Sequence, residues 1–270
     1  MTESALVSII TPTFNSAEFL SRTLRCVAEQ SYPNIEHIVV DGGSTDGTLE
    51  ILKNQQRVRW VSEPDNGMYD AINKGLKMAE GSILAYLNSD DLYFTDTVER
   101  VVKFFSSHPE TELVYSDCRY IDEKEEEMFV RKYPSFNWTL YAVLMGSTIP
   151  QQSCFWRRSV HEKVGYFDVQ FQLAGDFEFF IRAGKESRFT KIPGKPLAQF
   201  RFHRTMQTIN YVQANEEEVQ QIHRIHGFPP GVRSSILMLI AKARYKSKNV
   251  HRIWDKMSNL LSGDRTRYRA

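Results

Sequence analysis

The sequence predicts an α/β fold in which helices cover the faces of a mainly parallel β-sheet. Short apolar runs rich in β-branched residues alternate with segments whose apolar residues recur every three or four positions. Several of the apolar runs end directly in clusters of polar residues, as is typical of ligand sites at the carboxyl ends of parallel strands. With 270 residues, the chain has room for one large domain or two small ones.

Each element of the alternation follows from a local pattern. Residues 6–10 (Leu-Val-Ser-Ile-Ile) form a β-branched run that ends at Thr11-Pro12, which indicates a buried strand that runs into a loop. Leu20, Leu24 and Val27 recur at helical spacing and predict a crossover helix over residues 16–30. The same reasoning predicts further strands over 35–40, 58–61 and 82–87, and further helices over 46–52, 68–79 and 97–107.

The second half of the chain has a less regular pattern. Residues 133–152 mix aromatic residues, glycine and proline without a clear period, which is typical of a functional loop region. No linker rich in proline, glycine or serine interrupts the chain, so we expect one catalytic domain over 1–208 and a helical extension over 209–270. The remaining expected elements are a strand over 112–115, an exposed hairpin over 123–128, a buried helix over 177–183 and a strand over 197–202.

Composition excludes several classes of protein. Apolar residues make up 41% and charged residues 25% of the chain, which rules out collagen-like and wholly disordered proteins. The longest aliphatic run, residues 236–241, is far shorter than the roughly 20 residues that span a bilayer. The N-terminus lacks the features of a signal peptide, and the three cysteines have no metal-binding spacing. We therefore expect a cytoplasmic protein with reduced thiols.

The last forty residues differ in charge from the rest of the chain. Residues 231–270 hold ten Lys or Arg and two Asp, which gives +8, whereas the other residues sum to −7. Apolar residues at helical spacing over 250–261, including Trp254, predict a basic amphipathic helix. Such a helix packs on the catalytic body or on another subunit, or it lies on an anionic membrane surface. Nucleic acid is not an expected partner, because the basic residues accompany an aliphatic stripe rather than a stacking surface.

A pair of carboxylates follows the strand over 82–87, in the motif Asn88-Ser89-Asp90-Asp91. Adjacent carboxylates repel each other unless a cation, a proton or a donor lies between them. Their oxygens suit Mg²⁺ or Mn²⁺, and a divalent ion in turn suits the diphosphate of a sugar nucleotide. The structural alternative is a capping turn before the next helix.

Two further polar motifs follow expected strands. Val39-Val40-Asp41-Gly42-Gly43 places a carboxylate at a strand end beside two glycines, where it can accept the N–H of a pyrimidine base. A turn followed by a helix cap explains Ser44 to Thr48 equally well, but it explains Asp41 less well. In the segment over 63–75, Asp70, Asn73 and Lys74 share one helical face, from which Lys74 can meet a phosphate.

Taken in order, four motifs resemble the family 2 glycosyltransferases of GT-A fold. They are Val-Ser-Ile-Ile-Thr-Pro-Thr-Phe-Asn, Val-Val-Asp-Gly-Gly-Ser-Thr-Asp-Gly-Thr, Asn-Gly-Met-Tyr-Asp-Ala-Ile-Asn-Lys-Gly and Leu-Asn-Ser-Asp-Asp, and the resemblance covers about residues 6–205. It implies a nucleotide-diphosphate sugar donor, with a UDP-sugar favoured, and a divalent metal, Mn²⁺ or Mg²⁺. It also implies transfer of one sugar with inversion at the anomeric carbon.

The resemblance also implies roles for residues at the matching positions. Asp90 falls on the metal ligand of the Asp-X-Asp motif, whereas Asn88 departs from that motif because an amide adds no charge to a metal. Ser89 lies between them in the donor site. The other donor-binding residues implied are Thr11, Pro12, Thr13, Asn15, Asp41, Asp70, Asn73 and Lys74.

The catalytic carboxylate of the family corresponds to Asp176 in the motif Ala-Gly-Asp-Phe-Glu, so the resemblance implies that Asp176 is the general base. The structural alternative for Asp176 is an N-cap of the following helix. His203 matches a position where histidine approaches the metal or the diphosphate. Residues implied on the acceptor side are Gln151, Gln152 and Trp156.

The leading hypothesis is a glycosyltransferase that adds one sugar to a glycan or lipid-linked acceptor, peripheral on the inner face of the plasma membrane. A sugar nucleotidyltransferase ranks below it, because residues 11–16 lack the glycines and basic residues of a phosphate loop. A non-catalytic partner that binds nucleotide sugars within a glycan assembly complex is the third hypothesis.

Overall fold

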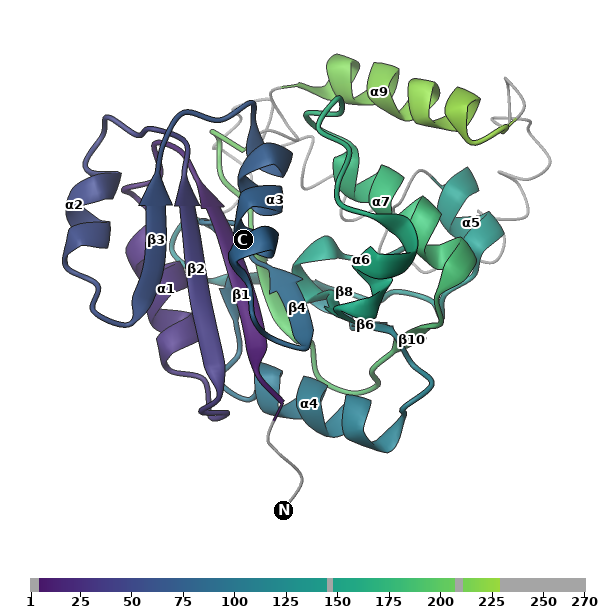
Figure 1. Cartoon of the computed structure of the whole chain (residues 1–270), viewed down its shortest axis with the longest axis horizontal. Helices are drawn as coiled ribbons and strands as arrows, with labels where there is room; N and C mark the ends of the chain where they lie inside the picture. Colours follow the sequence, from purple (N-terminus) through teal and green to yellow (C-terminus); the bar gives the residue numbers. More distant parts are fainter. Residues whose placement is uncertain (1–4, 145–147, 207–210, 229–270) are drawn as a thin grey trace, which may run out of the picture. The chain divides into compact units, whose positions relative to one another are not determined.

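Strands and helices alternate through the first half of the chain, as the apolar pattern predicts. The computed structural model describes residues 5–144, 148–206 and 211–228. In this part of the chain, a seven-stranded sheet has the order β10-β6-β9-β4-β1-β2-β3 (Figure 1). Its strands are β1 (Val7–Thr13), β2 (Ile35–Asp41), β3 (Val58–Ser62), β4 (Ile83–Tyr86), β6 (Leu113–Tyr115), β9 (Phe155–Arg157) and β10 (Phe189–Lys191).

The register of the central strands brings the polar motifs to one edge of this sheet. β1 pairs in parallel with both β2 and β4, and Thr13 at the end of β1 lies opposite Asp41 at the end of β2. The loops after β1, β2 and β4 therefore leave the sheet at the same edge. β9 is the exception to the parallel order, since it runs antiparallel to β4 and β6.

Three helices cover the two faces of the parallel half of the sheet. α1 (Leu20–Ala28) and α2 (Thr48–Lys53) bury Leu20, Leu24 and Leu52 against Val39. α3 (Met68–Met78) packs on the opposite face, because alternate residues of β2 point to opposite sides. Its Gly75 permits close contact, since a Cβ atom there would lie 2.5 Å from Ile10 Cγ2.

A second sheet of four strands includes β5, which directly follows the Asn88–Asp91 motif. Its order is β5-β11-β7-β8, with β11 parallel to β7 and antiparallel to β5. β7 and β8 form the hairpin that the sequence predicts, and it extends further on both sides than 123–128. The strands are β5 (Leu92–Tyr93), β7 (Cys118–Ile121), β8 (Glu127–Arg131) and β11 (Ala198–Arg201).

The remaining helices surround an aromatic core. Trp156 on β9 is fully buried and lies within 6.4 Å, between ring centroids, of Phe167, Phe179 and Phe180. Part of the expected loop region over 133–152 is helical, because its aromatic residues pack into this core. The helices are α4 (Thr97–Ser107), α5 (Trp138–Val143), the 3-10 turn η1 (Gln151–Ser153), α6 (Ser159–Val164), α7 (Gly175–Glu186) and α9 (Val212–Ile225).

The body of the chain includes α9, beyond the boundary expected at residue 208. Val219 and Ile222 on α9 are buried in the main core, so α9 belongs with the elements before it. The amphipathic helix expected over 250–261 lies outside the described residues.

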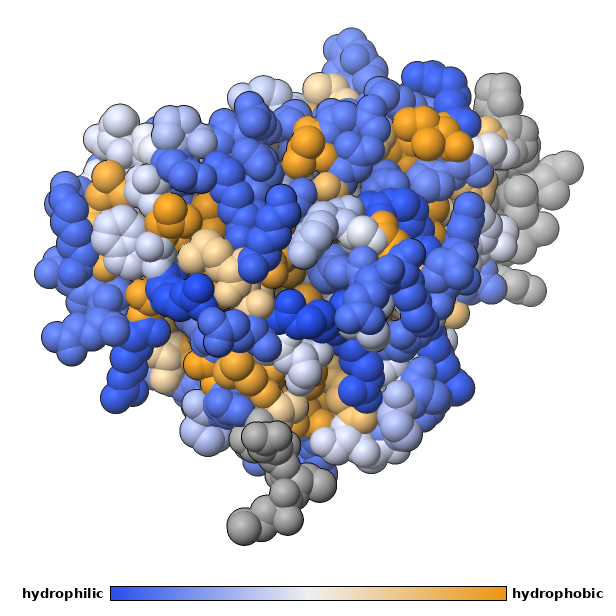
Figure 2. Space-filling view, viewed as in Figure 1, coloured by the Kyte–Doolittle hydropathy of each residue, from blue (hydrophilic) through white to orange (hydrophobic). Residues whose placement is uncertain are grey.

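The surface of the body is predominantly polar on the face that carries α3 and α9. Figure 2 shows apolar side chains scattered among hydrophilic ones on this face. No helix in the described part of the chain is both long and apolar enough to cross a bilayer.

Candidate active site

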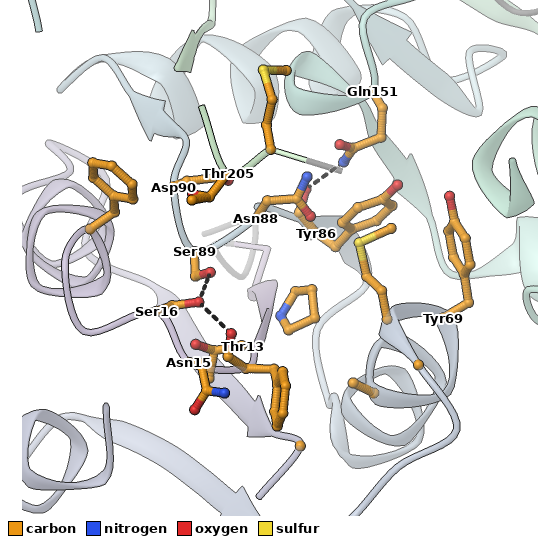
Figure 3. Close-up of a pocket in the computed structure, with 18 of the residues that line it drawn as sticks. Thr13, Asn15, Ser16, Tyr69, Tyr86, Asn88, Ser89, Asp90, Gln151 and Thr205 are labelled. Atoms are coloured by element: carbon orange, nitrogen blue, oxygen red, sulfur yellow. Dashed lines mark hydrogen bonds between the residues drawn. The ribbon is translucent and has the colours of Figure 1, made fainter. Parts of the chain in front are cut away.

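A cavity of about 650 Å³ opens at the carboxyl edge of the parallel strands (Figure 3). This volume is typical of a site for a ligand the size of a nucleotide. The loops after β1, β2 and β4 line it, together with the first turns of α3 and α7 and the segment after β11. The predicted site residues on its wall are Pro12, Thr13, Asn15, Asn88, Ser89, Asp90, Gln151, Gln152, Asp176 and His203.

Asp90 and His203 come together in this cavity although 113 residues separate them. His203 Nε2 lies 2.8 Å from Asp90 Oδ2, and its Nδ1 lies 2.8 Å from Thr205 Oγ1. The imidazole is 7% exposed and packs against the Phe19 ring at 4.7 Å. A carboxylate oxygen and an imidazole nitrogen thus share one side of the cavity, and both are ligand types that a divalent transition metal accepts.

Arg201 holds the loop that carries Asp90 through two hydrogen bonds. The Arg201 backbone N–H donates to Asp91 Oδ1 at 3.0 Å, and its Nε donates to the Asp90 carbonyl oxygen at 2.8 Å. Asp91 is 1% exposed, and burial raises the pKa of its carboxyl well above the usual range. Asp91 therefore supports the loop and leaves Asp90 to face the cavity.

Asn88 presents an unsatisfied oxygen at the same place. Its Oδ1 is buried and has no hydrogen-bond partner among the described residues. Thr13 Oγ1, from another residue of the cavity wall, is also buried without a hydrogen-bond partner among the described residues. Because buried polar atoms are normally paired, these two acceptors indicate that the cavity is shaped for a polar ligand.

Asp176 stands in the first turn of α7 and lines the other side of the cavity. Its Oδ1 accepts the Phe177 backbone N–H at 2.7 Å and the Tyr69 hydroxyl at 3.3 Å. Burial raises the pKa of this carboxyl above its ordinary value. The N-cap position belongs to Ala174, so the alternative role of Asp176 as a helix cap is wrong.

Tyr69 is a site residue that the sequence reasoning missed. It is 2% exposed, and its hydroxyl lies 3.4 Å from the Leu173 carbonyl oxygen as well as 3.3 Å from Asp176. The close approach requires glycine at position 175, where a Cβ atom would lie 2.7 Å from Tyr69 Cδ2. The sequence signal available for Tyr69 was its position next to Asp70 in the third motif. Adjacent residues of a helix point in different directions, so Tyr69 could face the cavity while Asp70 faces away from it.

Several predicted donor residues lie behind the cavity wall. Thr11 is fully buried and its Oγ1 bonds to His37 Nε2 at 2.9 Å. Asp41 is also fully buried, and its carboxylate accepts hydrogen bonds from Gly43, Ser44 and Ser62. Asp41 therefore does not line the cavity as predicted: N–H and O–H donors from its own loop and from Ser62 on β3 already bind its carboxylate, and Gly42 lies on the cavity wall instead.

The polar face of α3 does not enter the cavity either. The Asn73 amide bonds to both backbone groups of Phe167, at 2.8 and 3.1 Å. Lys74 pairs with Glu63 at 2.9 Å and with Asp70 at 3.7 Å on the outer surface. None of these three residues lines the cavity, where α3 places Met68, Tyr69 and Ala71 instead.

The acceptor-side predictions divide in the same way. Gln151 and Gln152 line the cavity, and Gln151 Nε2 donates to the Tyr86 carbonyl oxygen at 2.9 Å (Figure 3). Trp156 does not reach it, since the indole is fully buried and donates to His161 at 2.9 Å. Trp156 therefore does not line the cavity, contrary to its predicted place on the acceptor side, because its indole packs in the aromatic core.

The exposed lining of the cavity includes residues without an obvious sequence signal. Phe14 is 61% exposed, although it is a large apolar side chain. An exposed aromatic ring beside a polar cavity provides a surface on which a flat group can stack. Other lining residues not expected from the sequence are Asp65, Met68, Phe200, Met206 and Asn215.

Comparison with known proteins identifies the family of this chain. The model of the family described as "Glycosyl transferase family 2" matches residues 8–165, which is more than half of the chain. The chain belongs to glycosyl transferase family 2. The resemblance of its four motifs to this family is thereby confirmed.

The curated relatives of this chain include mycobacterial glycosyltransferases. The "PGL/p-HBAD biosynthesis glycosyltransferase" of Mycobacterium tuberculosis is 33% identical over 187 residues, which cover 66% of this chain and 69% of the relative. A second protein of that species, described as an uncharacterized glycosyltransferase, is 36% identical over 190 residues, or 68% of this chain and 70% of the relative.

Solved structures confirm the GT-A fold. TarS 1-349 of S. aureus in complex with UDP-GlcNAc superposes with a TM-score of 0.68 at 20% identity, over 82% of this chain and 65% of that one. The chain therefore spans slightly less than two thirds of the TarS fragment. The mannosyltransferase PcManGT of Pyrobaculum calidifontis, in complex with GDP-Man and Mn²⁺, has a TM-score of 0.62 at 18% identity, over 96% and 81% of the two chains.

Proposed function

We propose that this glycosyltransferase moves one sugar from a nucleotide-diphosphate sugar to a hydroxyl of a glycan or lipid-linked acceptor. A UDP-sugar is the favoured donor. The observation that carries the proposal is the convergence of Asp176 with the Asp90–His203 pair in one cavity. The ligands bound in the structural neighbours, UDP, UDP-GlcNAc and GDP-Man, support a sugar nucleotide as donor.

The proposed reaction is a single displacement with inversion. The acceptor oxygen attacks the anomeric carbon while the bond from that carbon to the diphosphate oxygen breaks. Asp176 takes the acceptor proton, and among the described residues only its Oδ1 is engaged in hydrogen bonds. Burial raises the pKa of Asp176, which makes its carboxylate a stronger base once it is ionised.

The residues present also fit a divalent metal. Asp90 and His203 would hold it, and Asn88 Oδ1 would add an uncharged oxygen beside them. Within the described residues no three His, Cys, Asp or Glu side chains converge, so the diphosphate and water would complete the set. When bound, Mn²⁺ or Mg²⁺ neutralises the charge that develops on the departing diphosphate.

Thermal shift of the purified protein tests the donor site. UDP, GDP, their sugar derivatives and plain buffer are compared with and without Mn²⁺, because a ligand that binds the folded state raises the melting temperature. We expect a metal-dependent rise with a uridine nucleotide. No rise with any nucleotide would contradict the proposed donor site.

We also propose that the basic residues 231–270 bring the enzyme to the inner face of the plasma membrane. The support is their charge of +8 and the apolar stripe over 250–261. Sedimentation with anionic liposomes compares the full chain with a chain that ends at Pro230. Equal binding of the two would exclude this role.

A further inference from the structure

The loop that leads into α7 takes its shape from a side chain of α9. The backbone N–H groups of Gln172, Leu173 and Ala174 all donate to the Glu218 carboxylate, at 2.8, 2.9 and 2.9 Å. In Figure 1 this loop rises from the body to α9. Three charge-assisted hydrogen bonds to one carboxylate fix the three residues relative to each other.

This arrangement adds acceptors at the start of α7. The N-cap residue Ala174 has no side-chain oxygen, and in the first turn Asp176 Oδ1 accepts the Phe177 N–H. From outside the helix, Glu218 accepts the N–H groups of Ala174 and of the two residues before it. Since Asp176 lies two residues after Ala174, the position of its carboxylate depends on where Glu218 holds the loop.

Glu218 can do this because α9 is itself anchored. Val219 and Ile222 are buried, His223 Nε2 lies 3.0 Å from the Ala142 carbonyl oxygen, and His226 Nε2 lies 3.2 Å from Glu178 Oε1 on α7. The same helix also reaches the cavity, since Asn215 is on its wall.

The loop in turn contacts the group that orients Asp176. Leu173 lines the cavity, and its carbonyl oxygen lies 3.4 Å from the Tyr69 hydroxyl that also approaches Asp176 Oδ1. A shift of the loop would therefore disturb both contacts of the Tyr69 hydroxyl, the one with the Leu173 carbonyl oxygen and the one with Asp176.

We propose that Glu218 is a positioning residue, which holds residues 172–174 so that Asp176 faces the reacting sugar. The inference rests on the proposed function and goes beyond it by assigning α9 to the catalytic machinery. Asp90 and His203 lie outside this chain of contacts, so Glu218 should affect the chemical step and leave nucleotide binding intact.

The experiment measures hydrolysis of the donor, in which water replaces the unidentified acceptor. The bond from the anomeric carbon to the diphosphate breaks, a bond to the water oxygen forms, and the water proton passes to Asp176 and then to solvent. UDP-GlcNAc, UDP-glucose and GDP-mannose are supplied with Mn²⁺, and release of UDP or GDP is followed. The dissociation constant of the same nucleoside diphosphate and the melting temperature are measured in parallel.

Glu218→Gln is the first variant, because it keeps the shape and places an amide N–H₂ group against backbone N–H donors. We expect kcat to fall by about 10- to 100-fold, as for a displaced catalytic group, with the KM for donor and the nucleotide affinity unchanged. Glu217→Gln is the matched control, with the same change one position earlier on an exposed side chain, and it should behave as wild type. If Glu218→Gln does not fold, Glu218→Asp, which is shorter by one methylene, takes its place.

The outcomes separate the two proposals. Unchanged kcat in the Glu218 variant overturns the inference, and so does a joint fall of kcat, nucleotide affinity and melting temperature, which would indicate a general structural role. No release of nucleoside diphosphate by the wild-type protein from any donor would overturn the proposed function, and the inference with it.

Discussion

Asp176 must serve two opposed requirements, because the burial that makes it a good base also makes its charge costly. Its raised pKa means that the folded state binds a proton more readily than the unfolded state. The stability that this provides is present at low pH and is lost as the pH rises through the folded pKa. Above that pKa the ionised carboxylate therefore destabilises the fold.

Asp176→Asn should separate these effects. Removal of the general base should lower transfer by about 10²- to 10⁴-fold. Removal of the buried charge should raise the melting temperature at pH 7.5 and have little effect at pH 4. Differential scanning fluorimetry at both pH values and a transfer assay provide the measurements. Unchanged transfer would reject Asp176 as the base.

Tyr69→Phe tests the hydroxyl that approaches Asp176. A hydrogen bond to a carboxylate favours its charged form, so its loss should raise the pKa of Asp176 beyond the rise that burial already causes. We expect the acid limb of the kcat–pH profile to move to higher pH. Tyr141→Phe is the control, since that buried tyrosine on α5 makes no hydrogen bond to Asp176 among the described contacts. An acid limb that stays in place would exclude this role of Tyr69.

At the scale of elements, α3 shows which features of a helix its sequence motif predicts and which it does not. The spacing of Asp70, Asn73 and Lys74 correctly predicts that they share one face of a helix. It cannot predict which neighbour that face meets, because the contact of Asn73 with Phe167 joins residues 94 positions apart. The carboxylate pair that includes Asp90 was recognisable from its place after a strand, His203 was recoverable only through the family pattern, and Glu218 lies beyond the region that the pattern covers.

Asn73→Ala should therefore destabilise the fold rather than weaken donor binding. It leaves two backbone groups of Phe167 without their partners, at a cost of about 1–3 kcal/mol. Urea unfolding measures this loss, and titration with UDP measures the affinity, which we expect to stay the same. Lys74→Ala is the neighbouring control, because partly exposed ion pairs contribute little. Weaker UDP binding by a folded Asn73→Ala protein would restore the sequence-based role.

At the scale of the whole molecule, two buried histidines should control the response of the fold to acid. Burial lowers the pKa of His37 and of His161 to about 4 in each case. Between pH 6.5 and 4 the unfolded chain takes up protons that the folded chain excludes, so stability falls with pH, by up to about 3 kcal/mol per histidine. Asp91 and Asp176, whose pKa values are raised, offset part of this loss.

Urea unfolding of the wild type and of His37→Gln at pH 7.5, 6 and 5 measures this response. The variant should lose less stability than the wild type between pH 7.5 and 5, because it lacks one group that takes up a proton on unfolding. Parallel losses in the two proteins would contradict the assignment to His37.

The alternation of strands and helices up to residue 107 was predictable, since each element there buries an apolar pattern of its own period. β9 and β10 were not predicted, although the equally short β6 was. The boundary at residue 208 was wrong because the apolar positions of α9 complete a core formed by distant residues. Sequence periodicity records local burial, whereas these features depend on long-range packing.

The position of β9 has a consequence for how the protein is made. β9 pairs with β4 on one side and with β6 on the other, yet both of those strands leave the ribosome before it. A nascent chain that ends before residue 155 therefore carries β4 with an open edge, and such edges recruit strands from other chains. We expect chaperone dependence to be greatest in the interval of translation before β9 emerges and to fall once β9 has closed the sheet.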